Sequence, residues 1–130
     1  MTPADELRAA AEKLRALATA ASTDTDGTPT AHWHSKDQAH DHSFLYGDYL
    51  TRDDGRTISW PLLLRGGSAQ RPSHMHPQHA AYAAAMGPTV GLALADWLDV
   101  ASVNAVVLTW PNDFIERALT VARAINGDQQ

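Results

Sequence analysis

The sequence contains no cysteine, so the chain forms no disulfide bond, no thiolate metal site and no zinc site of the nucleoside deaminase type. Basic residues are few: ten Lys and Arg stand against fifteen Asp and Glu, a formal charge of −5. Because such a chain has no basic field to attract phosphate groups, we expect neither nucleic acid nor an anionic membrane as a partner.

Two kinds of apolar segment are also missing. The first residues are polar and acidic rather than basic and then apolar, so they do not read as a signal peptide. No apolar run approaches the roughly 20 residues that a helix needs to cross a bilayer. We therefore expect a cytoplasmic protein without membrane contact.

The length of 130 residues and the hydrophobic fraction of 44% predict one ordered domain over residues 1–130. Glycine and proline mark residues 22–30 and 66–76 as loops or connectors, and residues 128–130 as a short tail.

The densest apolar stretch covers residues 77–98 and predicts two helices joined at a sharp bend. Pro77 suits a first helical turn, and Gly87 suits the left-handed conformation that ends a helix. Pro88 cannot continue the first helix but can begin the second.

The second of these helices has one apolar face, at three- and four-residue spacing: Val90, Leu94, Trp97 and Ala101. The small residues Gly91 and Ala95 lie four apart, so we expect another backbone to approach there. Residues 102–110 are rich in β-branched side chains and stay open between helix and strand.

Two further helices are predicted near the ends of the chain. The first covers residues 2–21, with Thr2 as its N-cap. The last begins at Asn112-Asp113 and ends at Asn126-Gly127. Its expected inner face consists of Phe114, Ala118, Val121 and Ile125.

The region between the helices shows strand patterns at residues 30–35, 44–50 and 57–64. Asp54-Gly55 is a strong turn signal and predicts a hairpin. The chain as a whole therefore predicts an α+β fold: an amino-terminal helix, a small antiparallel sheet of two or three strands, and three or four carboxy-terminal helices packed on one face.

Two apolar surfaces predict self-association. One is the helical stripe of Leu7, Leu14 and Leu17, for which packing within its own domain is the alternative. The other lies on the strand that carries Trp60, Leu62 and Leu64. We expect a homo-oligomer with these six residues at its interface.

All seven histidines fall into two clusters, residues 32–42 and 74–79, and three pairs have the H-x-H spacing that puts both imidazoles on one face of a strand. The candidate metal ligands are His32, His34, His74, His76 and His79. Asp37 or Asp41 would add a carboxylate, and imidazole ligands suit zinc, nickel or copper. The alternative is that these are solvated loop histidines.

No catalytic motif is present: the sequence has no G-x-S-x-G elbow, no P-loop and no dinucleotide fingerprint. We therefore predict no catalytic residue and no cofactor. A transition-metal-binding protein or metal-dependent hydrolase, using zinc or nickel, is the alternative.

Three segments resemble a family of small proteins encoded by actinobacteria and their phages, whose pattern is LRxAAe, a short sheet, and aayIAamxPxvxLaLadwL. They are residues 7–12 (LRAAAE), 79–88 (HAAYAAAMGP) and 90–98 (VGLALADWL), and residues 118–125 match the usual ending. The order is more distantly similar to the Ead-type proteins of tailed-phage early regions. Residues 22–76 depart from the pattern, since they carry the histidines.

The resemblance implies a phage- or prophage-associated accessory protein that acts as a binding or regulatory module on a host or phage protein. It brings no catalytic residue, because the matched positions are packing positions.

Overall fold

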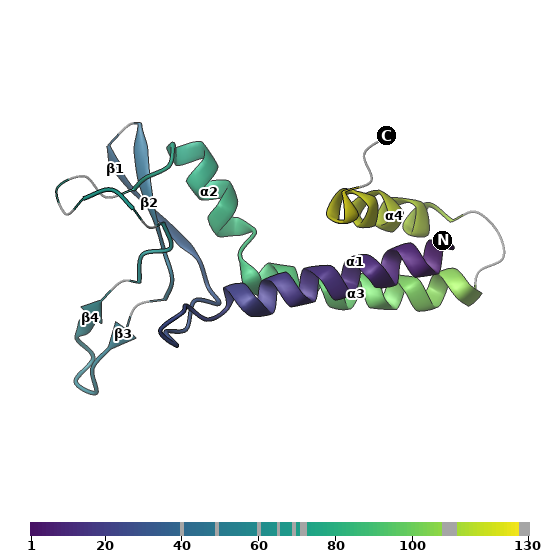
Figure 1. The fold of residues 1–130 in the computed structure, drawn as a ribbon, viewed down its shortest axis with the longest axis horizontal. Coiled ribbons are helices and arrows are strands. Elements are labelled where there is room, and N and C mark those ends of the chain that lie inside the picture. Colours follow the sequence, from purple (N-terminus) through teal and green to yellow (C-terminus); the bar gives the residue numbers. More distant parts are fainter. Residues whose placement is uncertain are drawn as a thin grey trace. The chain divides into compact units, whose positions relative to one another are not determined.

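The computed structural model describes residues 1–39, 41–48, 50–59, 61–64, 66–68, 70, 73–107 and 112–127. Over these residues the elements are α1 (Pro3–Ala21), β1 (His34–Ala39), β2 (His42–Tyr46), β3 (Leu50–Thr51), β4 (Thr57–Ser59), α2 (Pro77–Ala85), α3 (Pro88–Val107) and α4 (Asp113–Asn126) (Figure 1). The predicted α+β class is confirmed.

The chain divides into two compact units. Unit 1 comprises Met1–Ala18 and Gly91–Gln130, and unit 2 comprises Thr19–Val90. The sequence predicts a single domain over residues 1–130. The presence of two compact units does not decide this prediction, because compact units can still unfold together.

Unit 1 is built from helices with well-formed ends. At the start of α1, Thr2 Oγ1 accepts a hydrogen bond from Asp5 N at 3.1 Å, and the Asp5 carboxylate accepts one from Thr2 N at 3.2 Å. The Thr2 hydrogen bonds hold the pKa of Asp5 below its usual range. At the start of α4, Asn112 Oδ1 accepts from Phe114 N at 2.8 Å, and α4 ends at Gly127 with φ 82°. The predicted N-cap at Thr2 and the predicted start and end of the last helix are confirmed.

The core of unit 1 joins three helices, α1, α3 and α4, which lie side by side in Figure 1. Its buried members are Leu7, Ala10, Ala11, Leu98, Ala101, Ile115, Ala118, Leu119 and Ala122. A Cβ built on Gly91 would stand 3.0 Å from Ala18 Cβ, which confirms the close approach predicted at Gly91.

The predicted inner face of α4 is wrong in part. Ile115, Leu119 and Ala122 are buried, whereas Phe114 is 41% exposed and meets Trp97 edge to face. The apolar face of this helix is broad, and its packing centres on the stripe with Ala118 and Ala122, whose small side chains allow a closer approach to the neighbouring helices than Phe114 does.

Two arginines form three ion pairs between the helices of unit 1. Arg15 of α1 donates to Asp99 and Asp96 of α3, at 2.5 and 3.1 Å. Arg123 of α4 donates through two nitrogens to Glu6 of α1, each at 3.2 Å.

Unit 2 contains two antiparallel two-stranded sheets among the described residues, rather than the one sheet that the sequence predicts. β1 pairs with β2, and β3 pairs with β4 around the predicted Asp54-Gly55 turn, where Gly55 has φ 85°. Strands were expected at residues 30–35, 44–50 and 57–64. Their positions are partly wrong, because the histidine segment expected to be loop supplies β1 and the start of β2.

Short pairings widen the β1–β2 sheet on the far side of β2. Ser43 and Met75 exchange backbone hydrogen bonds of 2.7 and 2.9 Å. Leu63 N donates to Leu45 O at 2.9 Å, and Tyr46 bridges Leu62. β2 is therefore flanked on both sides, which holds the residues around it in place.

α2 packs against β1 and β2 and begins at Pro77, as predicted. The prediction for Gly87 is wrong, because its φ is not positive and the helix ends at Met86, whose N–H bonds the Tyr82 and Ala83 carbonyls. Gly87 is needed for space instead: a Cβ there would lie 3.1 to 3.4 Å from the Cγ, Cβ and Cδ2 atoms of Trp33.

Residues 102–107, for which the sequence allows helix or strand, are helical and form the end of α3. Residues 108–110 lie outside the described residues. With 20 residues, α3 is long and apolar enough to cross a bilayer, which corrects the expectation that no apolar run approaches this length. The core helix of a soluble protein passes the same test, and Leu98 and Ala101 of α3 are fully buried in unit 1.

Candidate functional site

The imidazoles of His32 and His34 meet at one carboxylate. His34 begins β1, His32 lies just before it, and Asp48 follows β2, so the hairpin brings the three together. Asp48 accepts from His32 Nδ1 and from His34 Nε2, each at 2.8 Å. The hydrogen bond with His34 is the larger cause, and that with His32 the smaller, of the lowered pKa of Asp48.

Both imidazoles of this H-x-H pair reach one carboxylate, as the one-face spacing predicts, and that carboxylate is Asp48 rather than Asp37 or Asp41. Asp37 accepts from Ser43 Oγ at 2.5 Å across the hairpin, and Asp41 pairs with His42 Nδ1 at 2.9 Å. Asp48 belongs to no sequence motif. Its position just after an aromatic strand is the only signal in the sequence that could have suggested a contact with the H-x-H pair, and this contact forms once the hairpin folds.

Four further histidines form two contacts, and His40 lies outside the described residues. His42 and His74 meet at a tilt of 56°, with ring centroids 4.9 Å apart, which joins the two clusters of the sequence. His76 and His79, with centroids 6.1 Å apart, share the start of α2 as expected. His34 and His42 lie in strands, so the reading of these two as loop residues is wrong.

The five expected metal ligands are therefore distributed over three places: His32 and His34 at Asp48, His74 against His42, and His76 with His79. Across the described residues, no three His, Asp or Glu side chains are arranged to hold an ion. Zinc or nickel binding stays a prediction.

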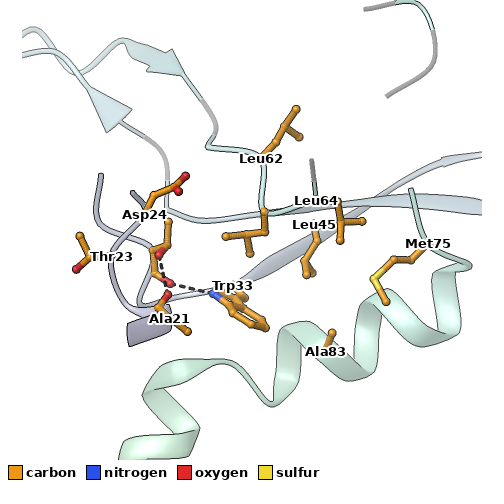
Figure 2. A pocket seen from close by; sticks show the side chains of 11 residues that line it. Ala21, Thr23, Asp24, Trp33, Leu45, Leu62, Leu64, Met75 and Ala83 are labelled. Atoms are coloured by element: carbon orange, nitrogen blue, oxygen red, sulfur yellow. Dashed lines mark hydrogen bonds between the residues drawn. The ribbon is translucent and has the colours of Figure 1, made fainter. Parts of the chain in front are cut away.

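A cavity of about 430 Å³ opens in unit 2, within the size range of small-molecule sites (Figure 2). Its lining is mainly apolar and comes from the end of α1, the following loop, β2, the segment 62–64 and α2: Ala21, Thr23, Asp24, Thr30, Trp33, Leu45, Leu62, Leu63, Leu64, Met75 and Ala83.

Hydrogen bonds fix one wall of this cavity. Trp33 Nε1 donates to Thr30 O at 2.9 Å, and the buried Thr30 donates through Oγ1 to Ala21 O at 2.7 Å. The indole N–H is thus satisfied, which leaves the ring as an apolar wall (Figure 2).

The residues expected at an oligomer interface differ in their burial and in the unit to which they belong. Leu7 is fully buried among helices of its own chain, which is the alternative that the sequence left open, and Leu14 packs partly against the same core. Leu17 is 58% exposed. Leu62 and Leu64 line the cavity, and Trp60 lies outside the described residues.

Sequence reasoning missed an exposed apolar surface on α3. Its members, which we call the valine face, are 57 to 70% exposed: Val100, Val103, Val106 and Val107. Their β-branched side chains obscured the helical spacing, although Val100, Val103 and Val107 follow a three-four pattern that a helix assignment through residue 107 would have revealed.

No known protein family, curated protein or solved structure matches the chain. The resemblance to the actinobacterial and actinophage proteins stays a prediction.

Proposed function

We propose that this chain is a non-enzymatic protein-binding module that self-associates through the valine face of α3. The observation that supports this most is the exposure of four neighbouring valines on a helix whose opposite face is already in the core of unit 1. A contiguous exposed apolar patch on a small protein commonly marks an interaction surface.

The spacing of the valine face fits a helix–helix contact. Val100, Val103 and Val107 occupy successive a, d and a positions of a heptad, the spacing at which one helix packs along another. The same face on a second copy supplies the complementary ridge, as a two-fold symmetric interface requires.

Charge favours a second copy over a lipid surface as the occupant. The charged residues of α3 are Asp96 and Asp99, and both carboxylates accept hydrogen bonds from Arg15. Two neutral valine faces meet without like-charge repulsion. A helix that lies on an anionic membrane instead carries Lys and Arg along its polar face, and α3 has neither.

The setting of the proposal is the cytoplasm of a bacterium that carries a phage or prophage, with a host or phage protein as the further partner. The acidic net charge supports a partner other than nucleic acid, and the phage association comes from the sequence resemblance.

The test is light scattering coupled to size exclusion over a range of protein concentrations. We expect the wild type to form a dimer and Val103→Glu to weaken it by about tenfold or more, since the dimer would bury two carboxylates. Leu17→Glu tests the α1 stripe, and Thr120→Glu, on an exposed position of α4, controls for the added charge. A monomeric wild type at high concentration, or equal dimer stability in all four proteins, would overturn the proposal.

The metal alternative is not the function proposed, because the candidate histidines are distributed over three places. It has its own measurement: elemental analysis of untagged protein, together with thermal shifts on adding zinc, nickel or copper. Protein without bound metal and without a shift would remove it.

A further inference from the structure

We propose that the cavity of unit 2 binds a small, flat, apolar molecule that is uncharged or cationic, an aromatic amine being the simplest example. This site belongs to a different unit from the valine face. The inference therefore goes beyond the self-association proposed above and does not depend on it.

The lining of the cavity selects for an apolar ring system. Trp33 presents its indole, Leu45 and Leu64 lie next to each other, and Met75 and Ala83 complete the lining (Figure 2). Leucine and tryptophan give up hydration when a ring covers them. Methionine adapts its shape and contacts aromatic rings favourably.

The walls of the cavity are held before any ligand arrives. Trp33 is fixed by its hydrogen bond to Thr30 and by close contact with Gly87. Backbone hydrogen bonds from Leu63 to Leu45 and between Ser43 and Met75 fix the opposite walls. A preformed site loses less conformational entropy when it binds, so that more of the contact energy appears as affinity.

The charge at the cavity decides which apolar molecules fit. Thr23 and Asp24 line the end near Ala21, and Asp24 brings a carboxylate to that rim (Figure 2). Among the described residues that line the cavity there is no Lys, Arg or His. A sulfonate or carboxylate on the ligand would therefore find no cationic partner among these residues and would lie near the Asp24 carboxylate of an acidic chain, whereas an amino group would be tolerated.

The experiment uses two fluorescent probes with the same ring system and the full chain. N-Phenyl-1-naphthylamine is uncharged, and 8-anilinonaphthalene-1-sulfonate adds an anionic group. We expect the neutral probe to bind saturably at one site per chain and the sulfonate to bind about tenfold more weakly. Asp24→Asn should reduce the difference in affinity between the two probes.

A pair of substitutions on α2 locates the site. Ala83→Leu extends a side chain into the cavity and should weaken the neutral probe by about tenfold or more. Ala81→Leu makes the same change at an exposed position of the same helix and should leave binding unchanged. Equal binding by both variants would overturn the proposal, as would binding that does not saturate.

A second measurement needs no substitution. In a ¹⁵N spectrum of the wild type, the indole N–H resonance of Trp33, assigned from its loss in Trp33→Phe, should move as the neutral probe is added. A probe that binds while this resonance stays fixed lies elsewhere, and the cavity is then not its site.

Discussion

The two units of this molecule are stabilised in different ways. Unit 1 has a cluster of nine buried apolar residues on three helices, with alanines at the closest approaches. Unit 2 has short strands, and two of its buried side chains, Thr30 and Ser43, are polar and hydrogen-bonded. Apolar packing therefore dominates unit 1, whereas hydrogen bonds between irregular segments place the residues of unit 2.

This difference relates to what each unit offers to a partner. Unit 1 offers apolar surface on the outside of a helix, on the valine face. Segments joined by backbone hydrogen bonds can enclose a space between them, and unit 2 contains the cavity.

The first prediction concerns packing in unit 1. Leu7→Ala removes a fully buried side chain from the core cluster and should lower the free energy of unfolding by about 2–5 kcal/mol. Leu17→Ala, on the same helix but exposed, should change it by less than about 0.5 kcal/mol. Urea denaturation followed by circular dichroism measures both. Similar losses in the two variants would show that packing does not distinguish the buried from the exposed side of α1.

The second prediction concerns the close contact in unit 2. Gly87→Val places a branched side chain against Trp33 and should cost about 1–3 kcal/mol through overpacking. Tryptophan emission should shift with it, because the indole must move. Ala85→Val, exposed at the end of α2, is the matched control and should leave the emission unchanged. If Gly87→Val unfolds like the wild type with the same emission, the space around Trp33 is not limiting.

The third prediction concerns Asp48, whose pKa is lowered chiefly by the hydrogen bond with His34. A carboxyl with a lowered pKa in the folded state stabilises the fold above its ordinary value of 3.8, and this contribution is lost as the pH falls through the folded-state pKa. The carboxylate is about half exposed, so Asp48→Asn should cost only about 0.2–1 kcal/mol near neutral pH.

The measurement is the difference in unfolding free energy between wild type and Asp48→Asn, taken near neutral pH and again well below 3.8. This difference in unfolding free energy should approach zero at the lower pH. The control is Asp53→Asn, in the exposed β3–β4 turn, for which we expect no such change with pH. A difference that grows at low pH would mean that Asp48 does not stabilise the fold in its ionised form.

Much of unit 1 could be predicted from the sequence. The cap at Thr2, the start of the last helix at Asn112 and its end at Gly127 all follow from local chemistry that acts within one or two turns. The inner face of α4 followed only in part, because its apolar face is broad and the neighbouring helices decide which edge of it is buried.

Less of unit 2 could be predicted. The Asp54-Gly55 hairpin is local, and the sequence indicates it. The partners of His32, His34 and Ser43 lie between 6 and 16 residues away and depend on strand register, which a histidine-rich segment without apolar alternation does not specify.

By itself, the sequence determined the α+β class, the start of α1 and both ends of α4, because caps, prolines, glycines and helical periodicity act over a few neighbouring residues. The tertiary structure alone decided which stripe of each helix is buried, that His32 and His34 share Asp48, and that apolar residues from several separate segments enclose a cavity. These features depend on contacts between residues far apart in the chain, and no local pattern encodes them.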